Sequence, residues 1–212
     1  MRKYGIQQTI VVFGGTRIYE SGKEGEGESR DYYRIAREFG ATVGRSGQGP
    51  EDCRLTLMTG GGPGIMEAAN RGASDVGAKS IGLNIRLPHE QAPNSYISDE
   101  LSFDFQYFAI RKLHFLLRAK ALVVFPGGFG TMDELFETLN LVQCRRIDPL
   151  PVVLVGKEFW QRAVNTDFLA ASGLIDSVHS SLFWYAETAN QIWDGIVSWY
   201  AEAGNPLLCE TQ

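Results

Sequence analysis

Four short apolar runs constrain the fold of this 212-residue chain more than any other feature. They are bounded by glycine or proline and lie at Thr9–Phe13 (TIVVF), Leu55–Thr59 (LTLMT), Ala121–Phe125 (ALVVF) and Pro151–Val155 (PVVLV). Apolar residues fill each run without alternating with polar ones, as is typical of strands buried on both faces of a parallel sheet. We expect a further strand at SIGLNI from Ser80 and a less regular one at LFWYAE from Leu182.

The segments between these runs are long enough for crossover helices. We predict helices at Asp31–Phe39, Ile65–Val76, Tyr107–Ala119, Met132–Gln143, Phe159–Ala171 and Glu187–Ala203. The last of these helices carries many apolar side chains, which suits packing on the sheet or on a second subunit. The sequence therefore predicts an α/β, Rossmann-like fold with a mostly parallel sheet and helices on both faces. No linker divides residues 1–212, so we expect a single domain.

Charge and cysteine usage exclude several classes of protein. With 20 Lys and Arg against 25 Asp and Glu, the net charge of -5 does not favour nucleic acid or an anionic membrane. The cysteines (53, 144 and 209) and histidines (89, 114 and 179) are scattered and show no metal-ligand spacing, so we expect no metal. The apolar run that ends at Phe13 is too short for a signal segment or a membrane span, which predicts a cytoplasmic protein.

Three glycine-rich turns each follow a predicted strand. They are FGGTR at Phe13–Arg17, TGGGPGIME at Thr59–Glu67 and FPGGFGTMDE at Phe125–Glu134. In a parallel sheet such turns lie at the same carboxyl edge, where open α/β folds bind ligands. Glycine leaves backbone N–H groups accessible, and a following helix N-terminus favours an anion. The turns therefore predict one shared phosphate-binding crevice.

The third turn has two interpretations. In the first, Thr131 and Glu134 form a capping box, in which each side chain bonds the other residue's backbone N–H. In the second, the turn is built for a ligand, because a capping box needs none of Gly127, Gly128 or Gly130. We favour the ligand.

The helix predicted before the strand at Ala121–Phe125 carries Arg111, His114 and Arg118 at i, i+3 and i+7, with Lys112 beside them. The stripe is either an ordinary solvated face or a place from which an arginine clamps a phosphate or a ribose.

General nucleotide motifs do not fit. The run from Gly62 to Glu67 begins like GxGxxG but ends in Glu, and Asn84 stands where a dinucleotide site would offer an acid for the ribose. No GxxxxGK[ST] sequence occurs, which disfavours a P-loop. We expect no cofactor.

Together, TGGGPGIMEAANRGA, the YFAIRKLHF helix and PGGFGTMDELFE resemble the LONELY GUY (LOG) family of nucleoside 5′-monophosphate phosphoribohydrolases, often labelled putative lysine decarboxylases. The resemblance spans roughly residues 9–155, and its specific element, PGGxGTxxE, matches at every fixed position from Pro126 to Glu134. The turn GGGPGIMEAAN differs from the GGGxxGLMG form of cytokinin-producing members, which leaves the base specificity open. Candidates to cover the base are Asn84, Arg86 and the loop to Asp99. None of the six lysines has a setting that suits pyridoxal phosphate.

The resemblance implies hydrolysis of the N-glycosidic bond of AMP or a cytokinin riboside monophosphate, giving free base and ribose 5-phosphate. Arg111 and Glu134 would be the catalytic pair. The residues implied to bind phosphate and ribose are Gly14, Gly15, Thr16, Gly60, Gly61, Gly62, Gly64, Met66, Lys112, Pro126, Gly127, Gly128, Gly130 and Thr131. Independently, a carboxylate at position 134 suits this chemistry, because an oxocarbenium-like ribose develops positive charge.

Two other functions compete with this one. The similar molybdenum cofactor carrier proteins bind a nucleotide-like or pterin phosphate without cleaving it, but a carrier has no need of a carboxylate at an anomeric carbon. A structural or regulatory scaffold would leave the three glycine turns unexplained. Family members commonly form dimers, so we expect a homodimer or a higher homo-oligomer.

Overall fold

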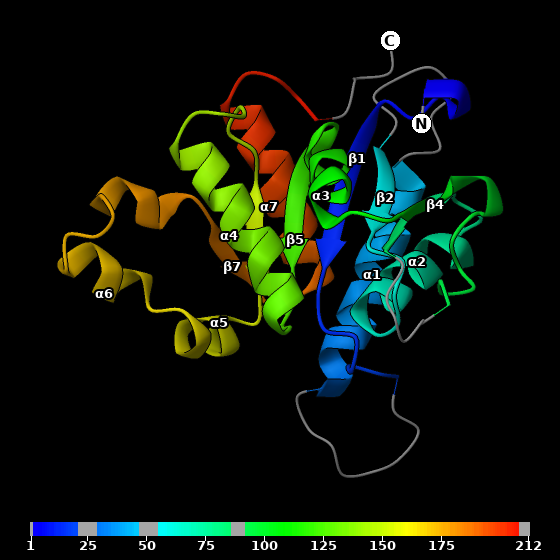
Figure 1. The fold of residues 1–212 in the computed structure, drawn as a ribbon, viewed down its shortest axis with the longest axis horizontal. Coiled ribbons are helices and arrows are strands. Elements are labelled where there is room, and N and C mark those ends of the chain that lie inside the picture. Colours follow the sequence, from blue (N-terminus) through cyan, green and yellow to red (C-terminus); the bar gives the residue numbers. More distant parts are fainter. Residues whose placement is uncertain (1, 21–28, 47–54, 86–91, 208–212) are drawn as a thin grey trace.

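The computed structural model describes residues 2–20, 29–46, 55–85 and 92–207. Their strands form one seven-stranded, entirely parallel sheet in the order β4-β3-β2-β1-β5-β6-β7 (Figure 1). The strands are β1 (Gln8–Phe13), β2 (Leu55–Thr59), β3 (Ser80–Ile85), β4 (Ser102–Phe105), β5 (Ala119–Val124), β6 (Val152–Val155) and β7 (Trp184–Ala186). The predicted fold class is confirmed, as are the strands expected from the apolar runs.

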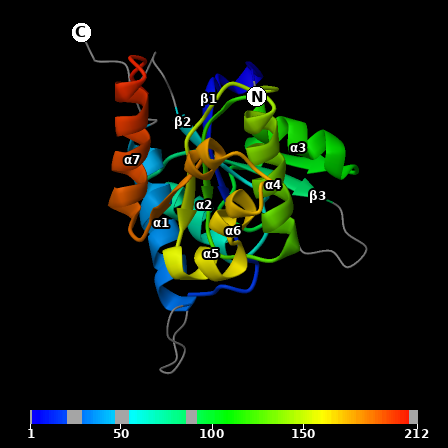
Figure 2. The same cartoon turned by 90° about the vertical axis from the view of Figure 1, so that its left-hand side faces the viewer.

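Helices cover both faces of the sheet, as Figure 2 shows with the sheet between two helical layers. On one face pack α1 (Ser29–Ser46), α2 (Ile65–Asp75) and α7 (Ala189–Glu202). On the other pack α3 (Phe108–Leu116), α4 (Phe129–Gln143) and α5 (Lys157–Ala163). A further helix, α6 (Thr166–Ala171), precedes β7.

The central strands supply the core on both sides. In β1, Ile10 and Val12 join the core under α1 and α2, while Val11 and Phe13 join the core under α3 and α4. The side chains of a strand point alternately to opposite faces, so a continuous apolar run is needed to cover both. The apolar face of α7 packs on this core, with Ile192 and Ile196 fully buried.

Several elements of the structure differ from the sequence prediction. Helix α1 continues beyond Phe39 to Ser46, and α3 ends at Leu116 rather than at Ala119, where β5 begins. The helix expected at Phe159–Ala171 is two helices, because Val164 is extended and Asn165 caps α6 by accepting from the Phe168 N–H. Strand β4 was not predicted, since SFDF is short and half exposed.

Glycines explain why α1 is longer than its sequence indicates. Gly40 ended the predicted helix, because glycine is unfavourable inside helices. A Cβ atom at Gly40 would lie 2.1 Å from the Ala69 carbonyl oxygen, and one at Gly72 would lie 1.9 Å from that of Arg37. These glycines therefore let α1 and α2 approach closely. The packing gained in this way outweighs the low helix propensity of glycine.

Several lysines, cysteines and histidines that the sequence analysis considered as cofactor or metal ligands lie outside the described ranges, among them Lys23, Cys53, His89 and Cys209, as does Arg86. Within those ranges, no helix is long and apolar enough to cross a membrane. The same ranges hold no cluster of three His, Cys, Asp or Glu side chains that could bind a metal ion.

Candidate functional site

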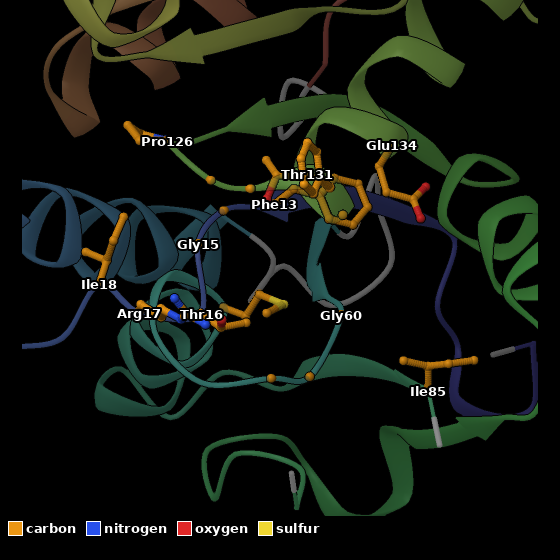
Figure 3. A pocket seen from close by; sticks show the side chains of 18 of the residues that line it. Phe13, Gly15, Thr16, Arg17, Ile18, Gly60, Ile85, Pro126, Thr131 and Glu134 are labelled. Atoms are coloured by element: carbon orange, nitrogen blue, oxygen red, sulfur yellow. The ribbon is translucent and has the colours of Figure 1, made fainter. Parts of the chain in front are cut away.

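The three glycine turns meet at the carboxyl edge of the sheet, around a cavity of about 830 Å³. Backbone hydrogen bonds join them: the Gly15 N–H donates to the Pro126 carbonyl over 2.8 Å, and the Ile65 N–H donates to the Gly15 carbonyl over 3.1 Å. Figure 3 shows Thr131 and Glu134 on one side of the pocket and the turn at Gly60 on the other. The predicted shared crevice is therefore present.

Most of the predicted site residues line this pocket. They are Gly14, Gly15, Thr16, Gly60, Gly61, Gly62, Met66, Arg111, Pro126, Gly127, Gly128, Gly130, Thr131 and Glu134.

Gly64 and Lys112 are not among the lining residues. Gly64 has φ +71°, and a Cβ atom there would lie 2.4 Å from the Gly15 carbonyl oxygen, so this glycine joins two turns. The Lys112 ammonium pairs with Asp133 over 2.7 Å and with Glu137 over 3.0 Å. Both residues therefore support the walls of the pocket.

Helix α4 begins at Phe129, with Gly128 as its N-cap and no side-chain capping bond. Thr131 and Glu134 thus lie inside the helix, and the Thr131 N–H donates to the Gly128 carbonyl over 3.0 Å. The capping-box interpretation is wrong, because the glycines start the helix earlier than Thr131. A Cβ atom at Gly128 or Gly130 would have no neighbour within 4 Å, so the start of α4 faces open space. Its first N–H groups and its dipole suit a bound anion.

Glu134 is 6% exposed and lines the pocket from α4. Burial raises the pKa of its carboxyl group to about 7, although the positive charges of Lys112 and Arg111 act in the opposite direction. A carboxyl group with a pKa near neutrality suits acid and base chemistry.

Arg111 reaches the pocket from α3. Its guanidinium lies over the rings of Phe108 and Phe115, 5.1 and 5.5 Å from their centroids, and its Nη1 atom donates to the Leu83 carbonyl over 3.5 Å. Burial lowers its pKa, and the nearby carboxylate of Glu134 partly offsets this shift. The Arg111 Nε atom is buried with no hydrogen-bond partner among the described residues.

The predicted stripe on this helix does not act as a unit. His114 lies against the Phe105 ring, with its Nδ1 atom 2.8 Å from the Ile110 carbonyl oxygen. Arg118 follows the end of α3 and is not a lining residue. Of the three stripe residues, only Arg111 lines the pocket, because His114 packs against Phe105 and Arg118 comes after the end of α3.

Asn84, which the sequence suggested could cover the base, lines the pocket, and the structure adds lining residues that were not assigned to the site: Phe13, Arg17, Ile18, Ile85, Phe108, Phe129 and Phe159. Phe13 and Arg17 belong to the first glycine turn, which could have drawn attention to them. Phe159 comes from α5, which follows a strand with no glycine-rich turn, so no motif pointed to it.

An amide network that was not assigned from the sequence supports the second turn. The Asn94 Nδ2 atom donates to the carbonyls of Gly61 and Gly62 and to Asn70 Oδ1 over 3.2, 3.0 and 3.0 Å. The Thr59 hydroxyl donates to the same Asn70 oxygen over 2.7 Å and accepts from the Gly61 N–H over 3.0 Å. Buried networks of this kind hold a turn in one conformation.

Similar proteins of known fold include molybdenum cofactor proteins. The molybdenum cofactor binding protein of Rippkaea orientalis is 19% identical with a TM-score of 0.59, over 91% of this chain and 97% of that one. The molybdenum cofactor carrier protein of Chlamydomonas reinhardtii is 20% identical with a TM-score of 0.59, over 93% and 99% of the two chains. At this identity, the likeness concerns the fold alone.

Curated relatives are nearer in sequence. A pyrimidine/purine nucleotide 5′-monophosphate nucleosidase of Escherichia coli K12 is 28% identical over 160 residues, which are 69% of this chain but only 30% of the relative's length. A probable cytokinin riboside 5′-monophosphate phosphoribohydrolase, LOG4, of Oryza sativa is 25% identical over 193 residues, 89% of this chain and 76% of the relative.

A family model described as "Possible lysine decarboxylase" matches residues 66–196, more than half of the chain. That range includes Arg111, Glu134 and the third glycine turn. With the relatives above, this match shows that the chain belongs to the LONELY GUY (LOG) family.

Proposed function

We propose that this protein is a cytoplasmic phosphoribohydrolase, which hydrolyses the N-glycosidic bond of a nucleoside 5′-monophosphate such as AMP or a cytokinin riboside monophosphate. The products would be the free base and ribose 5-phosphate. The observation that carries the proposal is that Arg111 and Glu134 face the same pocket as the open glycine turn at the start of α4.

The 5′-phosphate would bind at the start of α4. Gly127, Gly128 and Gly130 line the pocket there, and the helix N-terminus offers N–H donors and positive potential. Among the described residues, the charged ones that line the pocket are Arg17, Arg111 and Glu134, so the described wall carries more cations than anions. Binding the phosphate also supplies energy that can orient the reacting bond.

Glu134 would act at the anomeric carbon. As the base departs with the electron pair of the C–N bond, the ribose gains positive charge, which the ionised carboxylate stabilises. The same carboxylate can orient and deprotonate the water that attacks the anomeric carbon. Arg111 would hold the ribose with its unpartnered Nε–H, and its charge keeps part of the Glu134 population ionised.

The family description suggests a second reaction, decarboxylation of lysine, which would need a lysine to bind pyridoxal phosphate. No lysine is among the described residues that line the pocket. Lys112, which follows the lining residue Arg111, is paired with two carboxylates. The described residues therefore do not fit that cofactor.

We also propose that the protein is a homodimer formed through α3. Ile110, Leu113 and Leu117 follow i, i+3 and i+7 spacing and are 48, 63 and 65% exposed. Close by in the pocket wall, Phe129 is 96% exposed at the start of α4. Apolar side chains exposed along one helix commonly mark a subunit contact, and here the contact would border the mouth of the pocket.

The function is tested by incubating the purified protein with each common nucleoside monophosphate and with isopentenyladenosine monophosphate, and then quantifying free base and ribose 5-phosphate by chromatography. Glu134→Gln is the matched control, because it keeps the shape of the side chain but removes its charge. We expect base release by the wild type and a loss of about a hundred- to a thousandfold in the variant, the size of one lost electrostatic stabiliser.

Two results would contradict the proposal. Turnover unchanged in Glu134→Gln would rule out the catalytic role of this carboxylate. Tight binding of nucleotides with no base released from any of them would instead favour a carrier, like the molybdenum cofactor proteins that share the fold.

A further inference from the structure

Asn84 places a polar group in a part of the pocket that the proposed chemistry does not use. It is the fifth residue of β3, is 8% exposed and lines the cavity. Figure 3 shows its neighbour Ile85 on the side of the pocket opposite Thr131. Strand β3 is three strands away from β5, after which α4 begins, so Asn84 is a buried part of the wall away from the start of α4.

The Asn84 amide contacts strand β4 through a hydrogen bond. Its Nδ2 atom donates to the Ser102 hydroxyl over 3.0 Å, and its Oδ1 atom lies on the other side of the amide. This oxygen is buried with no hydrogen-bond partner among the described residues. A buried acceptor without a partner is destabilising, so a donor on the ligand is expected to complete the site.

Gly61 of the second glycine turn lies directly against this buried oxygen. A Cβ atom at Gly61 would lie 1.8 Å from Asn84 Oδ1, and Gly61 has φ +76°, a conformation that favours glycine. The Gly61 N–H donates to the Thr59 hydroxyl and is not available to Asn84. The turn thus passes close to the amide oxygen without satisfying it.

Strand order indicates which part of a nucleotide would reach Asn84. The proposed phosphate site follows β5, whereas Asn84 lies on β3, and β1 and β2 run between them. Three strand spacings amount to about 14 Å at the sheet edge. An extended nucleoside monophosphate covers roughly this span only from its phosphate to the far edge of its base, so the ribose hydroxyls fall short.

From these observations we infer that Asn84 Oδ1 accepts a hydrogen bond from the exocyclic amino group of a 6-aminopurine, and so selects AMP-type nucleotides. This inference rests on the proposed function and names its base-reading residue. A purine without the amino group leaves the acceptor unsatisfied, and a 6-oxopurine puts a second acceptor opposite it. A singly N6-substituted adenine keeps one N–H and is still accepted.

The experiment compares AMP, purine riboside 5′-monophosphate and 2′-deoxy-AMP by kcat/KM, and by calorimetric binding to Glu134→Gln, which measures recognition without turnover. In the wild type we expect AMP to be preferred over the purine nucleotide by at least about tenfold, the effect of one buried hydrogen bond. Asn84→Leu should reduce this preference to within about twofold and leave the ratio of AMP to 2′-deoxy-AMP unchanged. Asn84→Asp, which retains the acceptor, should keep the preference.

Equal use of AMP and the purine nucleotide by the wild type would overturn the inference, and so would a preference that survives in Asn84→Leu. A change confined to the 2′-deoxy ratio would also overturn it, because Asn84 would then read the ribose. If the leucine variant does not melt cooperatively, Asn84→Ser replaces it in the same comparison. Selective binding of AMP without cleavage would support the role of Asn84 while refuting hydrolysis, so the two proposals fail separately.

Discussion

The Arg111 Nη2 atom lies 4.0 Å from the Glu134 Oε1 atom, and their side chains are 12 and 7% exposed. This separation is too long for a hydrogen bond, although it is short enough for the two charges to interact strongly in a buried setting. The carboxylate therefore benefits from the positive charge while its oxygens remain available to a substrate. Burial still dominates, and the pKa of Glu134 is raised to about 7.

The first prediction concerns the pH dependence of the reaction. If the ionised form of Glu134 is the active one, kcat/KM rises with pH through about 7 and is lost below it, because the protonated carboxyl group cannot stabilise positive charge. Initial rates of base release between pH 5 and 9 measure this. The nucleotide phosphate also titrates, near pH 6, so a control is needed.

Arg111→Gln supplies that control. Removing the positive charge beside Glu134 should move the rise in kcat/KM to higher pH, because Arg111 lowers the pKa of this carboxyl group. The step that belongs to the phosphate would stay in place. A profile that has the same midpoint in both proteins would assign the titration to the substrate and not to Glu134.

The second prediction concerns stability. The folded state holds the Glu134 proton more tightly than the unfolded chain, so ionisation between about pH 4.5 and 7 reduces the free energy of unfolding. Glu134→Gln lacks this step. The free energy of unfolding of the variant, relative to that of the wild type, should therefore rise by roughly 1 to 3 kcal/mol between pH 5 and pH 8.

Urea unfolding of both proteins at several pH values measures this difference. Glu158→Gln, which replaces an exposed carboxylate on α5, shows how much of the change comes from the substitution alone. A difference between wild type and Glu134→Gln that does not grow with pH would refute a raised pKa for Glu134.

Much of the fold follows from local sequence patterns. The continuous apolar runs predicted both the strands and their burial, since no other arrangement hides both faces of such a segment. The length of α1 could not be predicted, because Gly40 and Gly72 are explained only by the approach of α1 to α2. That approach depends on residues about thirty positions apart in the chain.

The lining of the pocket was predicted where a glycine turn or the family resemblance points to it, as for Arg111 and Glu134, and was missed where it depends on isolated side chains. Glycine clusters after strands identified the turns. Asn84 and Asn94 act through bonds to Ser102 and to the second turn, which no spacing in the sequence encodes. Similarly, only the structure shows that Lys112 pairs with Asp133 and Glu137.

The third prediction concerns the subunit contact. Light scattering should give a mass twice the 23.5 kDa of the chain. Replacing both Leu113 and Leu117 by Glu puts charges on the exposed face of α3 and should yield monomers, because burying an unpaired charge costs several kcal/mol. Leu174→Glu is the matched control, since Leu174 is equally exposed, at 68%, but lies on the segment after α6. A monomeric wild type would refute the dimer.

The last prediction separates the phosphate site from stability. A Cβ atom at Gly130 meets nothing within 4 Å, and the residue lies in the first turn of α4. Gly130→Ala should therefore keep or raise the melting temperature, because alanine is the better helix former by up to about 1 kcal/mol. The added methyl group would occupy the proposed phosphate site, so KM for the nucleotide should rise by at least about tenfold, the effect of losing a charge-assisted hydrogen bond.

Gly127→Ala is the contrasting variant. Its Cβ atom would lie 2.2 Å from the Thr131 hydroxyl oxygen, so this substitution should lower both the melting temperature and the affinity. Thermal melts and KM values for the two variants, measured side by side, test the assignment. If Gly130→Ala has a normal KM, the phosphate does not bind against the start of α4, because a stable variant with a filled site cannot otherwise bind nucleotide as the wild type does.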